Sequence, residues 1–192
     1  MSKGRSGIRG VVLCEDKRTE RFVRHLLEEL GFEKRKWDFR PAPSGKGAGE
    51  AWVLTQYPGE VKAQRAKASE NRCLIAIRDG DRFGVRHRKE QLDAALKSCE
   101  MTLRQQEERI ATPVPTWSIE NWLLNLLDHP SIDESASSVD GQTWKHVFEN
   151  MPGQEERTAL MDAATAWKVG VGDRAELPSL VDGRTEIERL DG

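Results

Sequence analysis

The chain has 192 residues, of which 37% are hydrophobic, which suits one core of ordinary domain size and excludes two independent domains of comfortable stability. Charged residues make up 32% of the chain but nearly cancel, so the formal net charge is only -2. This balance excludes a general affinity for nucleic acid or anionic membranes, and any nucleic-acid site must be a local basic patch.

No apolar stretch reaches the length of a membrane span, and the N-terminal sequence MSKGRSGIRG lacks the apolar region of a secretory signal. We therefore expect a cytoplasmic protein without a membrane partner. The three cysteines, Cys14, Cys73 and Cys99, form no CxxC pair, and their odd number argues against a disulfide framework.

The first predicted unit is a strand followed by a helix. Residues 11–14, VVLC, are consecutively apolar, which predicts a short strand buried on both faces. Apolar residues then recur at helical spacing over 19–30, and Gly31 is expected to end this helix. Glu15 stands between the two, so a buried strand ends on a carboxylate.

A second, weaker strand is expected over residues 36–40. The Pro/Gly-rich stretch PAPSGKGAGE then forms a loop that leads into a helical region from about residue 50 to residue 69. Pro58 is expected to break this helix at Tyr57, because the residue before a proline avoids the helical conformation.

The run CLIAI, residues 73–77, repeats the pattern of a buried strand and is followed by RDGDRFG. This second strand also ends in acids, Asp79 and Asp81. Apolar positions over 86–99 share one helical face, which predicts a helix after the acidic turn.

Residues 109–114 are expected to form a fourth strand, and SIENWLLNLL a helix with Ser118 as its N-cap and Glu120 in its first turn. Strands that alternate with helices predict an α/β fold, with a mainly parallel four-stranded sheet flanked by helices. We expect this domain to occupy residues 1–130.

The remaining residues, 131–192, are expected to form a helical C-terminal extension packed on the first domain. After a polar loop, the sequence predicts helices near 142–150, 155–168 and 177–190.

The acids that follow the strands predict a metal site. Carboxyl ends of parallel strands share one edge of a sheet, where open α/β sheets bind ligands. Four acids are expected at this edge: Glu15, Asp79, Asp81 and Glu120. Carboxylates this close raise one another's pKa, so a counter-charge is needed. Mg²⁺ or Mn²⁺ is the expected cofactor, because hard cations take oxygen ligands.

Each acid also has a simpler interpretation. A single acid after a strand is usually a helix cap or a solvated turn residue, and Asp-Gly-Asp is a common turn. Glu20, in the first turn of the first helix, either faces the metal or favours the helix N-terminus electrostatically.

The segments VVLCE, IAIRDGD and SIENWLL resemble the Toprim fold, the metal-binding module of topoisomerases, bacterial primases and the nucleases of the OLD family. The resemblance is closest to the Toprim domain of OLD-family nucleases and covers roughly residues 10–127. It implies a Rossmann-like sheet in which Glu15, Asp79 and Asp81 bind Mg²⁺ and support cleavage of phosphodiester bonds. One departure is Glu15-Asp16, where the family usually has Glu-Gly.

Basic residues beside the acids are candidates for holding the scissile phosphate. Lys17 lies in the first strand-to-helix loop and Lys46 in the glycine-rich loop, and both are expected to contact substrate. Other basic residues flank the acids at Arg18, Arg78, Arg82, Arg86, His87 and Arg88. The simpler interpretation is that such residues neutralise the acids or form a solvated face.

The expected function is a Mg²⁺- or Mn²⁺-dependent nuclease of Toprim/OLD type that hydrolyses DNA or RNA, as an effector of a bacterial defence system. The expected metal ligands are Glu15, Glu20, Asp79, Asp81 and Glu120. Because no separate nucleic-acid-binding domain is visible, we expect a partner such as an ATPase, or a homo-oligomer.

Two other functions stay open. One is a non-catalytic Toprim-like interaction or regulatory module that works with a partner protein, which the Glu15-Asp16 departure and the balanced charge favour. The other is an enzyme that acts on a small phosphorylated metabolite at the same edge.

Overall fold

The computed structural model describes residues 5–43, 48–129, 132–136, 138–139, 142–172 and 175–191. The longer strands and helices, in chain order, are β1 (Arg9–Cys14), α1 (Lys17–Glu29), β2 (Trp37–Pro41), α2 (Ala48–Ala66), β3 (Arg72–Ala76), α3 (Gly84–Ser98) and α4 (Ile119–Leu126). The shorter strands and the C-terminal helices are β4 (Ile110–Ala111), β5 (Ser138–Val139), β6 (Gln142–Thr143), α5 (Trp144–Glu149), α6 (Gly153–Val169) and α7 (Pro178–Glu188).

The central sheet has four parallel strands in the order β2-β1-β3-β4. Val12 of β1 lies in register with Phe39 of β2 and Ile75 of β3. The predicted α/β class and parallel sheet are confirmed. From β1 the chain passes through α1 to one edge strand, and from β3 it passes through α3 to the other. The topological switch point, where open sheets form their ligand crevice, therefore lies between the carboxyl ends of β1 and β3.

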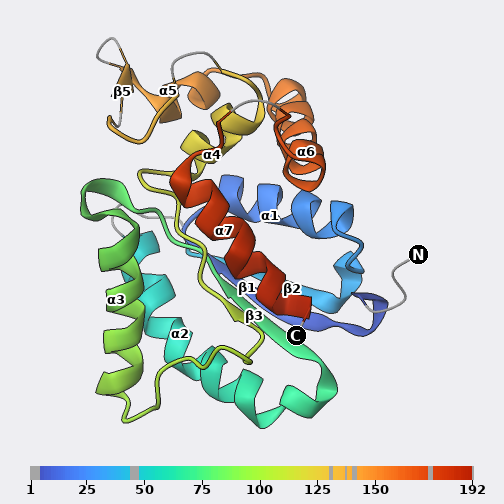
Figure 1. Cartoon of the computed structure of the whole chain (residues 1–192), viewed down its shortest axis with the longest axis vertical. Coiled ribbons are helices and arrows are strands. Elements are labelled where there is room, and N and C mark those ends of the chain that lie inside the picture. Colours follow the sequence, from blue (N-terminus) through green and yellow to red (C-terminus); the bar gives the residue numbers. More distant parts are fainter. Residues whose placement is uncertain are drawn as a thin grey trace.

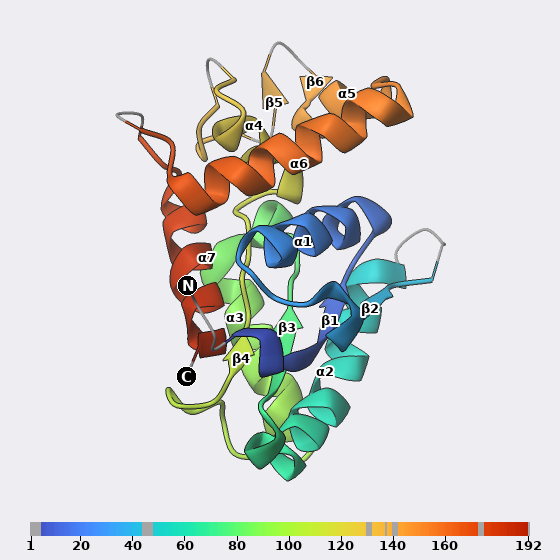
Figure 2. The ribbon, with the colours of Figure 1, turned by 90° about the vertical axis from the view of Figure 1, so that its right-hand side faces the viewer.

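Helices cover both faces of the sheet (Figure 1). Alternate residues of β1 point to opposite faces, so Val11 and Leu13 pack with α2 and α3, whereas Val12 and Cys14 pack in the core that contains α1. In Figure 2 the strands point toward the end of the molecule that holds α4, α5 and α6. That end covers the switch point.

The C-terminal helices share the core of the sheet. The Trp167 ring of α6 contacts Phe22 of α1 and Trp122 of α4, with ring centroids 6.1 and 5.5 Å apart. The Trp122 indole N–H donates to Ser179 Oγ at 2.7 Å, and Gly183 of α7 leaves room for the same ring. The predicted extension therefore has no separate core within the described residues. The boundary at residue 130 stays a prediction.

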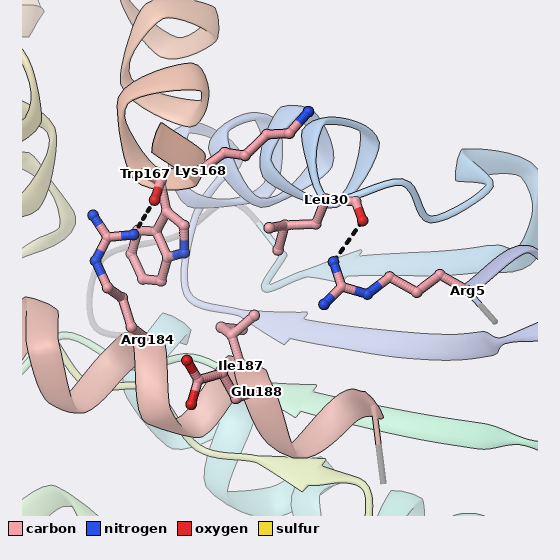
Figure 3. A pocket seen from close by; sticks show the side chains of 7 residues that line it. All are labelled: Arg5, Leu30, Trp167, Lys168, Arg184, Ile187 and Glu188. Carbon is pink, nitrogen blue, oxygen red and sulfur yellow. Dashed lines mark hydrogen bonds between the residues drawn. The ribbon is translucent and has the colours of Figure 1, made fainter. Parts of the chain in front are cut away.

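A cavity of about 170 Å³ lies where α1, α6 and α7 meet (Figure 3). Its basic side chains are engaged by the protein itself. Arg5 donates to the Leu30 carbonyl at 2.6 Å and pairs with Asp191, and Arg184 donates to the Trp167 carbonyl. The contacts around this cavity thus hold Arg5 and α7 against α1 and α6.

The predicted break at Tyr57 is wrong, because α2 runs through Pro58. Val53, Tyr57 and Val61 recur at a spacing of four residues and are all buried against the sheet. Burial of this stripe outweighs the backbone hydrogen bond that proline removes.

The predicted strand over 109–114 is too long, since β4 contains only two residues. Pro113 has no N–H, and the Thr112 N–H donates to the Glu186 carboxylate of α7 at 2.8 Å. A side chain of the C-terminal helix thus takes the place of a neighbouring strand. The two-residue strands β5 and β6, which pair antiparallel, were also not predicted.

The predicted positions of the other elements hold within a few residues. Gly31 takes a positive φ of 88° just after α1, as expected of a residue that ends a helix. Cys14 and Cys73 are buried and unbridged. Across the described ranges, no helix combines the length and apolar character needed to cross a bilayer.

Glu186 is the main polar link between α7 and the rest of the protein. Its carboxylate accepts from both terminal nitrogens of Arg104, from the Thr112 N–H, and from Lys89 Nζ at 3.1 Å. Burial alone would raise the pKa of Glu186, but the hydrogen bonds and charge of Arg104, with Thr112 and Lys89, lower it to about 2.

We predict that Glu186→Gln lowers the free energy of unfolding by about 3 kcal/mol near neutral pH, because it leaves the partly buried Arg104 without its anion. In the wild type this stabilisation is complete above the ordinary carboxyl pKa of 4.5 and is lost as the pH falls toward 2. Urea denaturation at several pH values measures both effects. Glu188→Gln, on the exposed side of the same helix, is the control, and equal stability of the two variants would contradict the assignment.

Candidate functional site at the carboxyl edge of the sheet

Four acids occupy the loops that leave the carboxyl edge of the sheet. Glu15 follows β1, Asp79 and Asp81 follow β3, and Glu120 lies in the first turn of α4. Asp79 and Glu120 are buried, whereas Asp81 is partly exposed. The topology thus places the acids around the switch point, as the sequence predicted.

Gly80 holds the β3–α3 loop against the segment between β4 and α4. The Gly80 N–H donates to the Pro115 carbonyl and the Asp81 N–H to the Trp117 carbonyl, both at 2.8 Å. A Cβ on Gly80 would lie 2.6 Å from the Pro115 carbonyl oxygen and closer still to that of Thr116, so only glycine fits. Asp81 takes a positive φ of 46°, which turns the chain into α3.

Asp79 is buried in the site, with 5% of its surface exposed. Its Oδ1 accepts the Ile119 N–H of α4 at 3.0 Å, and Lys145 Nζ lies 3.5 Å from its Oδ2. Burial raises the pKa of Asp79, and the charges of Glu120 and Glu15 act in the same direction against that of Lys145. Glu120 and Glu15 therefore lie close enough to Asp79 to disfavour its charged form.

Each of the four acids has a cation from the same chain. Arg18 pairs with Glu120, Arg78 Nε lies 3.5 Å from Glu15, Arg88 pairs with Asp81 at 2.8 Å, and Lys145 with Asp79. The counter-charge that the sequence assigned to a metal is thus supplied, in this structure, by basic side chains.

Two of these cations are fully buried. Arg78 and Arg88 have 0% of their surface exposed, and both donate to Gln91 Oε1 at 3.0 Å. This shared acceptor on α3 fixes the two guanidinium groups beside Glu15 and Asp81. A buried guanidinium stays charged and needs anions around it, so these acids help to hold the loop as well as to form the site.

The donor chemistry of the edge suits a hard divalent cation, because it consists of carboxylate oxygens. Glu120 Oε2 is buried and has no hydrogen-bond partner in the described part of the chain. The carboxylates are nevertheless held apart in ion pairs, and no three Asp, Glu, His or Cys side chains among the described residues are close enough together to hold a metal ion. Metal binding would therefore require some of the pairs to open.

The other predicted site residues lie outside this group of four acids. Glu20 pairs with Arg24, one turn further along α1. Lys17 is the first residue of α1 and is exposed, and Lys46 lies outside the described residues. Asp16, the departure from Glu-Gly, accepts the Thr19 N–H at 2.8 Å as the N-cap of α1. Roles for Glu20, Lys17 and Lys46 at the site stay predictions.

Lys145 is the site residue that sequence reasoning missed. It comes from α5, 66 positions beyond the acid that it faces, and a lysine on a short amphipathic helix carries no local signal of such a contact. Arg78, in contrast, did carry a local signal in the sequence. It continues the apolar run CLIAI directly before Asp79, where an arginine must be buried with an anion nearby.

No family model and no curated protein matches this chain. Among solved structures, the chain is similar to the C-terminal region of the Burkholderia pseudomallei OLD protein, with 12% sequence identity and a TM-score of 0.38. The similarity covers 96% of this chain and 95% of that chain. Both the identity and the TM-score are low, so this similarity by itself assigns neither family nor function.

We predict that Gly80→Ala destabilises the protein by about 2 kcal/mol, because the added Cβ forces the acidic loop away from the 115–117 segment. Chemical denaturation measures the change. Gly59→Ala is the matched control, since a Cβ on Gly59 of α2 meets no atom within 4 Å. That control is expected to gain up to about 1 kcal/mol from helix propensity. Wild-type stability of Gly80→Ala would show that the loop does not depend on this close approach.

Proposed function

We propose that this protein is a divalent-metal-dependent phosphodiester hydrolase of the Toprim/OLD type that cuts DNA or RNA. The observation that carries the proposal is that Glu15, Asp79, Asp81 and Glu120 all follow strands at the carboxyl edge of a parallel sheet, around its switch point. The buried Glu120 oxygen without a hydrogen bond supports it, because a cation would satisfy that atom.

The four acids would hold Mg²⁺ or Mn²⁺, and Glu20 would join them only after its pair with Arg24 opens. When bound, such an ion neutralises charge on a phosphate and lowers the pKa of an attacking water. The chain's own residues would orient the carboxylates and the basic side chains beside them. The Ile119 N–H fixes one oxygen of Asp79, and Gln91 fixes the guanidinium groups beside Glu15 and Asp81.

The cations that now pair with the acids would also serve the substrate. The side chain of Lys145 is 45% exposed and that of Arg18 is 21% exposed. Both would therefore have room to turn from a carboxylate to a phosphate at the surface. Each would offset the charge that develops on the phosphate during hydrolysis. We keep Lys17 and Lys46 as further proposed phosphate contacts.

The second candidate is a non-catalytic interaction module. The observation that favours it is that all four acids already have a basic partner, so the edge is electrically balanced without a metal. In that function the ion pairs would hold the loops as a fixed surface for a partner protein. A cytoplasmic location and a partner protein belong to the proposal in either form, whereas the role as effector of a bacterial defence system belongs to the nuclease.

A calorimetric titration with Mn²⁺ distinguishes the two functions without the need for a substrate. We expect saturable binding to the wild type and at least about a tenfold loss of affinity in Asp79→Asn. The amide oxygen of the introduced asparagine can still accept the Ile119 N–H, so this variant keeps the contact with α4.

Asp162→Asn is the control for this titration, because Asp162 is an exposed acid on α6. It is expected to bind Mn²⁺ as the wild type does. Absence of binding to folded wild-type protein would refute metal catalysis by the isolated chain and favour the interaction module.

The ion pair of Lys145 gives a second, opposite prediction. If the lysine and the metal compete for Asp79, Lys145→Gln should bind Mn²⁺ about fivefold more tightly than the wild type, because one positive charge beside the site is removed. Lys168→Gln removes a lysine of similar exposure that pairs with Glu29 of α1, and it should leave the affinity unchanged. A weaker affinity in Lys145→Gln would mean that the lysine supports the site and does not compete for it.

A further inference from the structure

A basic groove of about 410 Å³ runs between α1 and α6. Its lining comes from both helices and from the turn after α1, and consists of Arg21, Arg24, His25, Lys34, Gly153, Arg157 and Leu160. In Figures 1 and 2, α6 lies beside α1. The ring of Phe22 on α1 contacts that of Trp167 on α6, with the ring centroids 6.1 Å apart. The walls of the groove are therefore held by the core.

The groove side chains that carry charge are all basic. Three of them each form an ion pair with an acid: Arg24 with Glu20, Lys34 with Glu28 and Arg21 with Glu156. In contrast, Arg157 is exposed and makes no ion pair or hydrogen bond with the described residues.

The pKa of His25 is affected by the same basic side chains. Burial lowers the pKa of His25, and Lys34, Arg157 and Arg24 lower it further, while Glu28 acts against them. The three cations therefore lie close enough together to act on one imidazole, and an anion entering the groove would be attracted by all of them.

A chain of ion pairs links the groove to the acidic edge. Arg18 contacts both Glu120 of the edge and Glu156 of α6, and Glu156 also contacts Arg21 in the groove. Along α1, about one helical turn separates Arg18, which contacts Glu120 of the edge, from Arg21 at the start of the groove. A single phosphorylated metabolite at the edge would not reach it, whereas a polymer would continue into it.

We propose that the α1/α6 groove binds the sugar-phosphate backbone of a nucleic-acid strand whose scissile phosphate lies at the acidic edge. This inference rests on the proposed function, because the edge defines where the strand must pass. No Phe, Tyr or Trp is among the lining residues, so the groove offers the bases no stacking surface. The contacts are to phosphates and do not select sequence.

The test is equilibrium binding of a fluorescently labelled oligonucleotide in EDTA, where no metal-dependent cleavage occurs. The test variant is Arg21→Gln/Arg157→Gln. Both residues are exposed, and Glu156 keeps its pair with Arg18, so the fold should be retained. We expect roughly tenfold weaker binding at moderate salt and a salt slope reduced by about two, one for each lost phosphate contact.

Lys62→Gln/Lys97→Gln is the control, because it removes the same charge from α2 and α3 on the opposite face of the sheet. It should bind within about twofold of the wild type. Equal losses in the two double variants would overturn the groove assignment, and so would wild-type affinity and salt slope in the groove variant. An oligonucleotide that does not bind the wild type at low salt would also overturn it.

The Mn²⁺ titration and the binding assay fail independently. Binding that depends on the groove, in a protein that binds no Mn²⁺, would reject the proposed hydrolase and keep the groove as a nucleic-acid site. Metal-dependent cleavage with an unchanged KM in the groove variant would reject the groove and keep the hydrolase.

Discussion

The need to balance four carboxylates at one edge of a parallel sheet organises this molecule. Burial of an acid such as Asp79 is unfavourable unless a positive charge lies close by. The strands themselves supply no cation there, because β1 and β3 are apolar at their carboxyl ends. The cations come instead from the helices and loops around the edge, and each of them fixes an element in place.

This requirement ties the C-terminal helices to the sheet. Lys145 brings α5 to Asp79, and Arg18 links Glu120 of α4 to Glu156 of α6. Near the end of α7, Glu186 reverses the pattern, since here the extension supplies the acid and the first part of the chain supplies the cations. With the Trp122 and Trp167 contacts, these links join the sheet and the extension around one hydrophobic core.

The same ion pairs determine how the edge can act. A metal ion that entered would have to compete with side chains already in place, so metal binding would be coupled to release of Lys145 or Arg18. Release of these side chains at the edge would make positive charge available to a phosphate at the moment when the carboxylates are taken by the ion. If the edge binds no metal, the same pairs are a rigid framework, and the α1/α6 groove is the part of this surface that still suits an anion.

The sequence alone determined the strand and helix order, the parallel α/β sheet and the position of the acids at the ends of strands. Those features follow from local periodicity and from the rule that parallel strands share a carboxyl edge. Tertiary structure decided the rest. Pro58 stays inside a helix because Tyr57 is buried, β4 is short because Glu186 binds Thr112, and Asp79 faces Lys145 from α5. Each of these outcomes depends on contacts between residues distant in sequence, whose energies no local pattern contains.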